Sequence, residues 1–491
     1  MTGIAIVIYL NQPPYQVRER DYAYAGSFYS FSIWIGLAVA AIYTWVADKC
    51  SQKKPATCEV SIASAVTVLL LGVPALMAAE NWDDHDRSNR YTAVEMARNY
   101  LNSVGENGIL VTHGDNDTFP LWYAQEVENV RPDVRIANTS LLGTDWHIDQ
   151  MKYAMNESAP LDLQVGPRQY LYGTNEYVFI QERFEDVIPL YDVMRLFRHP
   201  DVKLTLTNNK DVDYIVARKF SIPVNKENVL KYGILDAKYA DQIPDEIVLT
   251  IPKDKSYLTK PELFMLDLLS NYQWDRPLHL LSMGGDINIG IKDYLMYEGF
   301  SYKFVPIKNK MKSTEIGFAD AEDLYNKMKN VYSWDALKRT DYFVDYQNFY
   351  TFCGVLSQRQ LFVNVAREQL KVGDKARAIE MLDMCQECVP AEAYPLDIIY
   401  LGFSNEYMVL DMIELYYEAG ANEKALDLAE RFADELMVSA RFFLNNYDYT
   451  KREFDTCYTT LSYLAEVADI YGDKEFAEKV RSSFNELLDI E

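Results

Sequence analysis

Two uncharged segments near the N-terminus limit what this chain can fold into. Ala25–Val46 carries no charged side chain over 22 residues, and Val60–Ala79 carries none over 20. A helix needs about 20 apolar residues to cross the hydrocarbon core of a bilayer. Gly72 and Pro74 would weaken a helix in water but are tolerated in membrane helices. We therefore expect membrane helices at 25–46 and 60–79 within a membrane region, residues 1–80; two buried core helices are the alternative.

The loop between these segments suggests an orientation. It is short and carries Lys49, Lys53 and Lys54. Short loops rich in lysine favour the cytoplasmic side of a membrane, so everything after Glu80 is expected outside the cytoplasm. The bias is small, because arginines also flank the outer ends of both segments.

The extreme N-terminus is apolar but short. Gly3–Leu10 cannot span a bilayer, and it lacks the basic region and the cleavage site of a signal peptide. It looks like the end of a third membrane helix, so Met1 is expected to be an internal methionine or a fragment boundary. A short strand or an interfacial segment is the alternative.

The net charge of the chain argues against two classes of function. Lysine and arginine total 48 against 73 aspartates and glutamates, a net charge of -25. A general nucleic-acid binder needs a basic surface, and so does a protein held on an anionic membrane by a polybasic patch. We therefore expect no nucleic-acid partner. The hydrophobic content of 49% also excludes wholesale disorder.

The middle of the chain alternates between strand and helix patterns. An apolar run at 109–112, a polar loop, a helical stretch at 121–130 and an apolar run at 134–137 predict a βαβ unit. A second such unit is predicted from a strand at 246–252, a helix at 260–272 and a strand at 277–282, with an added edge strand at 301–307. We expect an α/β domain with a mostly parallel sheet over residues 81–315, outside the cytoplasm.

The polar loop after the first strand is a candidate site. It contains Asp115, Asn116 and Asp117. Ligands commonly bind at the carboxyl ends of the strands in an open α/β sheet, and an Asp-x-Asp pair there can hold a hard cation such as Mg²⁺ or Mn²⁺. The alternative is structural: Asp117 caps the following helix and Asp115 supports the turn.

A second acidic cluster follows the second membrane segment. It consists of Asp83, Asp84, His85 and Asp86. These side chains are metal-ligand candidates, and they would share one site with Asp115 and Asp117 if the fold brings the clusters together. The alternative is a solvated segment that caps the next helix.

The C-terminal part is predicted to be helical, over residues 316–491. A Gly-x4-Ala spacing recurs from Gly373, Gly420 and Gly472, each time between two helical stretches. This pattern is typical of tetratricopeptide-like repeats, although the intervals exceed the usual repeat length of about 34 residues. Such arrays generally bind proteins on a concave face; bracing the α/β domain is the alternative. The Cys-x-x-Cys pair, Cys385 and Cys388, is expected to be buried rather than redox-active or metal-binding.

Four strings resemble a known family. They are YLNQPP at Tyr9–Pro14, RERDYAY at Arg18–Tyr24, ENWDDHDR at Glu80–Arg87 and GDNDTFPLWY at Gly114–Tyr123. Together they resemble Bacteroidetes membrane proteins of domain-of-unknown-function family 2723, also classed as glycosyltransferase family 117. The resemblance covers most of the chain and corresponds to the C-terminal portion of the family.

The resemblance implies a multi-pass protein of the inner membrane, similar to protein O-mannosyltransferases. Such proteins move a sugar from a polyprenyl-phosphate donor to a protein hydroxyl, and a large C-terminal region lies in the periplasm. The family's catalytic loop has no counterpart here, so no catalytic residue carries over and the chain resembles the tail of the enzyme.

Three functions remain open. The preferred hypothesis is the C-terminal part of a glycosyltransferase-like membrane protein that binds an acceptor or partner protein through the repeats and the Asp115–Asp117 loop. Arg18 and Arg20, beside the membrane, are candidates for binding the phosphate of the donor; headgroup anchoring is the alternative. The other hypotheses are a non-catalytic membrane-anchored scaffold and a metal-dependent enzyme that uses Asp115 and Asp117.

Overall fold

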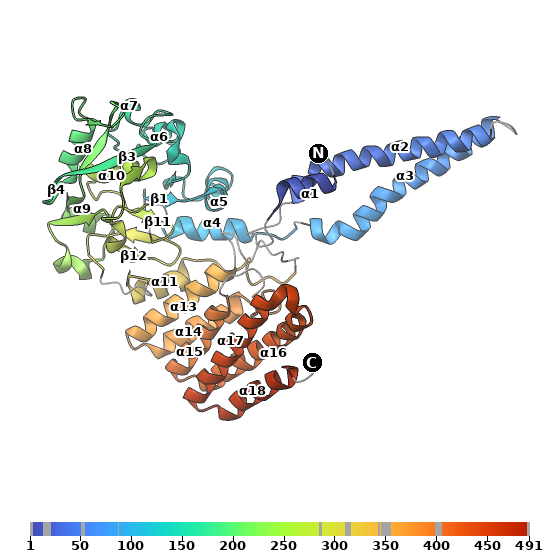
Figure 1. The fold of residues 1–491 in the computed structure, drawn as a ribbon. Coiled ribbons are helices and arrows are strands. Elements are labelled where there is room, and N and C mark those ends of the chain that lie inside the picture. Colours follow the sequence, from blue (N-terminus) through green and yellow to red (C-terminus); the bar gives the residue numbers. More distant parts are fainter. Residues whose placement is uncertain are drawn as a thin grey trace.

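The computed structural model divides the chain into apolar N-terminal helices, a central part built on a mixed sheet, and a C-terminal helical part (Figure 1). It describes residues 3–12, 21–50, 55–86, 88–283, 287–309, 316–341, 344, 355–397 and 405–488.

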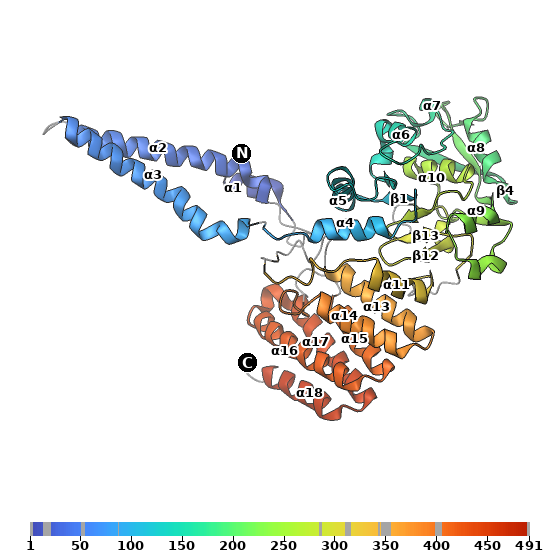
Figure 2. The same ribbon diagram turned by 180° about the vertical axis from the view of Figure 1, so that it is seen from behind.

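The N-terminal helices form a hairpin that projects from the rest of the molecule (Figures 1 and 2). They are α2 (Ala25–Cys50) and α3 (Pro55–His85), preceded by the short helix α1 (Ile4–Leu10). Segments Tyr22–Lys49 and Val60–Trp82 are long and apolar enough to cross a membrane, and at most 6% of either apolar window is buried. Helices of a soluble core would be mostly buried. The two expected spans are thus confirmed as candidate membrane helices, and they indicate that the protein associates with a membrane. The multi-pass topology and the orientation of the chain in the membrane stay predictions.

The first predicted βαβ unit is present at the centre of the main sheet. Strand β1 (Ile109–Thr112) pairs in parallel with β2 (Arg135–Asn138), and α5 (Asp115–Glu126) connects them. The helix begins at Asp115, inside the segment predicted to be a loop. On its other side β1 pairs in parallel with β11 (Leu278–Leu280).

The sheet as a whole is mixed, so the expectation of a mostly parallel sheet was wrong in this respect. Its strand order is β14-β12-β13-β11-β1-β2. Strands β12 (Leu295–Tyr297) and β13 (Tyr302–Phe304) form an antiparallel hairpin, because the connection between them is too short for a parallel crossover. β13 lies between β11 and β12 rather than at an edge, and β14 (Phe318–Ala319) forms that edge.

The chain between β2 and β11 builds smaller sheets and short helices. The remaining strands are β3 (Tyr177–Phe184), β4 (Ile188–Pro189), β5 (Leu204–Thr205), β6 (Asp211–Val212), β7 (Tyr214–Ala217), β8 (Lys219–Pro223), β9 (Glu246–Thr250) and β10 (Tyr257–Thr259). The helices are α6 (Asp145–Met151), α7 (Pro167–Tyr170), α8 (Leu190–Arg198), α9 (Lys226–Lys231) and α10 (Lys260–Ser270). β9, α10 and β11 occur where the second βαβ unit was predicted, but β9 pairs antiparallel with β8 in a separate sheet. That unit was therefore wrong, although its elements were right.

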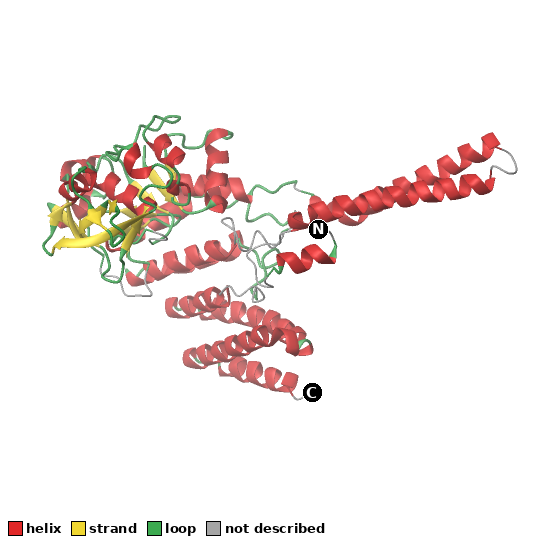
Figure 3. Ribbon diagram, turned by 45° about the horizontal axis from the view of Figure 1, so that its top comes forward, coloured by secondary structure: helices red, strands yellow, loops and turns green. Residues whose placement is uncertain are grey.

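The C-terminal part consists of helical hairpins, as predicted (Figure 3). After α11 (Ala321–Asn330) come α13 (Val355–Lys371), α14 (Lys375–Cys388), α15 (Asn405–Ala419), α16 (Asn422–Asn445), α17 (Tyr447–Tyr471) and α18 (Lys474–Leu488). The three repeat glycines lie in the turns with φ between 83° and 100°, a conformation that favours glycine. The alanines that follow, Ala378, Ala425 and Ala477, are fully buried. The tetratricopeptide-like name itself stays a prediction.

Helix α4 (Thr92–Asn102) joins the central and C-terminal parts. Met96 packs in the core of the helical part, whereas Ala97 and Leu101 pack beside β1. The Glu95 carboxylate accepts the backbone N–H of Ala336 at 2.9 Å, and Asn99 exchanges two hydrogen bonds with the backbone of Ser333 at 2.8 and 2.9 Å. Both side chains are buried, so these bonds fix the segment that leads into the helical part.

We expect Glu95→Ala combined with Asn99→Ala to loosen this junction. Each buried group left without its partner costs roughly 1–3 kcal/mol. Hydrogen exchange at the amides of Ser333 and Ala336 should therefore accelerate by at least about tenfold. Glu106→Ala, at an exposed position just beyond α4, is the control and should leave both rates unchanged. Equal rates in the double variant and the control would contradict this role.

Candidate functional site

The loops that follow β1, β2 and β11 converge at one edge of the sheet, as expected for the carboxyl ends of parallel strands. His113, directly after β1, lies 2.8 Å from the Ser282 hydroxyl beyond β11 through its Nε2 atom. The Asn138 amide at the end of β2 donates to the Gly114 carbonyl at 2.9 Å and to the Thr118 hydroxyl at 2.7 Å. Hydrogen bonds thus tie the turn between β1 and α5, next to Asp115, to both neighbouring strands.

The two aspartates of this loop have different surroundings. One Asp117 carboxylate oxygen accepts the N–H of His113 and the other accepts the N–H of Gly114, both at 2.9 Å. Asp117 therefore caps α5, which explains why the helix begins early. Asp115 and Asn116 are exposed in the first turn of α5, and the Asp115 carboxylate accepts the N–H of Asn116 at 2.9 Å. Their side chains face solvent and are open to a ligand.

Most of the other expected site residues lie outside the part of the chain that the structure describes. Arg18 and Arg20 lie outside the described residues, and so do the side chains of Asp83, Asp84 and His85 at the end of α3. Asp86 is exposed and accepts the N–H of Ser88 at 2.8 Å. Among the residues that the structure describes, no group of three or more His, Cys, Asp or Glu side chains is arranged to hold a metal. A shared metal site of the two clusters stays a prediction.

Aromatic side chains of α5 and α6 gather around His147, which bonds to Asn138 at the same edge of the sheet. Phe119 stacks on Trp122 with ring centroids 5.5 Å apart, and Trp122 and Trp146 both contact the ring of His147. His147 is buried, accepts the N–H of Asn138 through Nε2, and has its pKa lowered to about 4 by burial. Phe119, Tyr123 and Trp146 are exposed. The edge thus combines open polar groups with an accessible aromatic surface.

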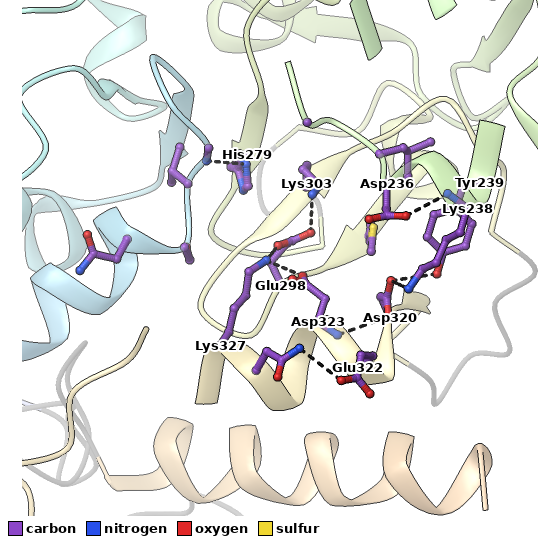
Figure 4. A pocket seen from close by; sticks show the side chains of 18 residues that line it. Asp236, Lys238, Tyr239, His279, Glu298, Lys303, Asp320, Glu322, Asp323 and Lys327 are labelled. Carbon is purple, nitrogen blue, oxygen red and sulfur yellow. Dashed lines mark hydrogen bonds and ion pairs between the residues drawn. The ribbon is translucent and has the colours of Figure 1, made fainter. Parts of the chain in front are cut away.

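A cavity of about 430 Å³ lies between the sheet and α11 (Figure 4). At its base the Glu298 carboxylate, which is 1% exposed, forms an ion pair with Lys303 at 2.7 Å and another with Lys327. Lys327 also pairs with Asp323 at 2.6 Å. At the other end of the cavity Lys238 pairs with Asp320, and the Tyr239 hydroxyl donates to the same carboxylate at 3.1 Å.

Burial shapes the electrostatics of this cavity. Burial lowers the pKa of Lys303 and that of Lys327 to about 8, while the nearby carboxylates of Asp323 and Asp320 act to raise the pKa of Lys303. Burial also raises the pKa of Asp323. Beside them His279 is buried, its pKa is held well below the usual value by burial, and it contacts the Ser301 hydroxyl at 2.9 Å. The four charges of Glu298, Lys303, Lys327 and Asp323 compensate one another, so the arrangement joins the β12–β13 hairpin to α11.

Sequence reasoning missed this cavity. Its charged residues come from segments far apart in the chain, and no short motif contains them. One signal was available: Glu298 and Lys303 flank the tight turn between two apolar strands, where charged residues facing a core need partners.

The two cysteines of the Cys-x-x-Cys pair are buried and free, as expected. Burial raises the pKa of both thiols to about 12, which disfavours the thiolate form needed for redox or metal chemistry.

The chain thus combines candidate membrane helices, a mixed-sheet domain with exposed polar and aromatic side chains at one edge, and a helical C-terminal part. Residues 93–323, which include this sheet and edge, match the family model described as TMEM260-associated domain 2. The match suggests a TMEM260-like family related to membrane glycosyltransferases. No curated protein matches the chain, and no solved structure matches it.

The low pKa of His147 predicts a loss of stability in acid. In the unfolded state the His147 imidazole binds a proton as the pH falls below about 6.5. In the folded state it does so only near pH 4, so the free energy of unfolding decreases between these two values. We expect a loss of about 2 kcal/mol from this group between pH 7 and pH 5. His147→Gln should remove that part of the loss in denaturant titrations of the detergent-solubilised chain, and His199→Gln, at an exposed histidine, should not. Parallel pH profiles for the wild type and His147→Gln would refute the assignment.

The buried ion pairs predict a second effect. Glu298→Gln leaves two buried ammonium groups without their shared carboxylate, and breaking a buried pair costs about 3–5 kcal/mol. We expect a loss of that size in the free energy of unfolding, measured at pH 7. Glu322→Gln, which weakens an exposed pair with Arg377, should have little effect. A Glu298→Gln variant as stable as Glu322→Gln would show that the lysines are accommodated without the carboxylate.

Proposed function

We propose that this chain is the acceptor-binding portion of a glycosyltransferase-like membrane protein, which transfers a sugar from a polyprenyl-phosphate donor to a protein hydroxyl. The match of residues 93–323 to a TMEM260-associated domain supports this class, and so do the two candidate membrane helices. A lipid-linked donor requires a protein that works at a membrane.

The exposed edge beside α5 carries the proposal. Asp115 and Asn116 offer hydrogen-bonding groups, and Phe119 on α5 and Trp146 on α6 offer exposed aromatic surface. An extended acceptor segment needs both: polar groups to orient its backbone and hydroxyls, and apolar surface to gain affinity. Gly114, at the start of α5, accepts a hydrogen bond from Asn138 and donates one to Asp117. Because this turn is already ordered, binding loses little conformational entropy of the protein.

The location of this edge favours the same role. α5 is on the side of the central part that faces the α2–α3 hairpin (Figures 1 and 2). An acceptor bound there is close to the membrane surface, where the phosphate of a lipid-linked donor resides. The exposed carboxylate of Asp115 is chemically suited to accept a hydrogen bond from the acceptor hydroxyl.

Photo-cross-linking in the source cells tests the proposal. A photoreactive phenylalanine analogue replaces Phe119, and in the matched control it replaces Tyr172, which is also highly exposed. We expect position 119 to capture proteins whose peptides carry sugar on serine or threonine, and Asp115→Ala to reduce the yield by at least about threefold, in line with one lost hydrogen bond to a charged group. Equal capture at the two positions, or captured proteins without sugar, would contradict acceptor binding.

A non-catalytic membrane-anchored scaffold is the second candidate. The helical hairpins α13–α18 favour it, because stacked hairpins generally offer a protein-binding face. Capture of unglycosylated partners from the helical part, with none at position 119, is the result expected for a scaffold.

A further inference from the structure

The turn between α16 and α17 exposes large apolar side chains. Phe442 is 61% exposed and Val438 is 71% exposed near the end of α16, and Tyr449 is 89% exposed at the start of α17. Single exposed apolar residues are ordinary, but a cluster of this kind generally marks a contact surface.

The same turn is locally basic in an acidic protein. Between Val438 and Arg452 the chain has three basic residues, Arg441, Lys451 and Arg452, and one acidic residue, Asp448, whereas the whole chain has a net charge of -25. Two exposed aspartates, Asp434 and Asp455, lie about one helical turn beyond its ends. Lys451 lies over the ring of Tyr447. Aromatic side chains beside lysine and arginine are typical of the membrane interface, where the rings sit at headgroup depth and the cations meet anionic lipids.

The position of the turn identifies the surface that it meets. In both labelled views the α16–α17 turn lies on the side of the helical part from which the α2–α3 hairpin projects, below the end of α3 (Figures 1 and 2). The opposite end of α17 points away from the hairpin.

The connection to the membrane is short. Only residues 86–91 separate the end of α3 from the start of α4, which limits that connection to roughly 20 Å. α4 in turn is bonded to the segment entering the helical part through Glu95 and Asn99. The helical part is thus kept near the bilayer that α3 leaves.

We propose that the α16–α17 turn, residues 438–452, rests on the surface of the bilayer. Its aromatic side chains lie at headgroup depth, and Arg441 and Lys451 contact anionic headgroups. This contact is independent of sugar transfer: it fixes the height of the soluble body above the membrane for an enzyme or a scaffold alike.

Depth-dependent fluorescence quenching tests this contact in the full chain. The chain carries Cys50→Ser, Cys58→Ser and Cys353→Ser, because the other cysteines are buried and unreactive. Tyr449→Cys is labelled with an environment-sensitive fluorophore, and the chain is reconstituted in phosphatidylcholine–phosphatidylglycerol vesicles that contain a headgroup-level lipid quencher. Ile470→Cys, 77% exposed at the other end of the same helix, is the matched control.

We expect the label at 449 to be quenched several-fold more than the label at 470. Arg441→Glu with Lys451→Glu should reduce quenching at 449 toward the control value, because the turn then repels anionic lipid. Equal quenching at the two positions overturns the proposal. Protection of position 449 from aqueous iodide without quenching by lipid also overturns it, because that result assigns the turn to a contact between copies of the chain. Unchanged quenching after the double charge reversal overturns the assignment of the basic residues.

Discussion

The parallel pairing of β1 with both β2 and β11 is the constraint on which the rest of the structure depends. β1 is buried along its whole length, and Leu110 pairs with Ile136 on one side and His279 on the other. This pairing brings together segments from opposite ends of the central part. It places His113, Asn138 and Ser282 at one edge, and it provides the surface on which α4 packs. Both the open edge and the junction to the helical part follow from it.

Buried positive charge is the second organising feature of this acidic protein. The guanidinium of Arg135 is 1% exposed and donates to the carbonyls of Tyr153, Ser158 and Ala159, and burial lowers its pKa to about 10. Arg276 reaches the same segment through the Ala159 carbonyl and the Ser158 hydroxyl. Carbonyl oxygens thus accept hydrogen bonds from both cations, and the charges of Asp275 and Asp133 also favour the charged form of Arg276. The two arginines fix the irregular segment that follows α6 against the sheet.

The features that sequence predicted are those that depend on local physics. The membrane candidates follow from length and missing charge, the β1–α5–β2 unit from the change of hydrophobic period, and the helical hairpins from Gly373, Gly420 and Gly472 in their turns. The features that it missed depend on pairing across long separations. Nothing near β9 shows that it pairs with β8 while β11 joins β1. The early start of α5 depends on capping by Asp117. From the sequence alone an aspartate at this position fits helix capping and metal binding equally well, so the start of the helix could not be predicted.

The position of α5 and that of the α16–α17 turn have one physical consequence. Both lie on the side of the molecule from which the hairpin projects (Figures 1 and 2), and in the proposed arrangement the open edge and the basic turn therefore face the same bilayer. In the proposed function, an acceptor segment held at a fixed height above a membrane meets a lipid-linked donor at a high effective concentration, and weak individual contacts to the acceptor then suffice. The exposed Asp115 and Asn116 have few partners of their own, which suits such weak contacts. The net charge of -25 keeps the remaining surface away from anionic lipid, so the few cations of the turn set the orientation.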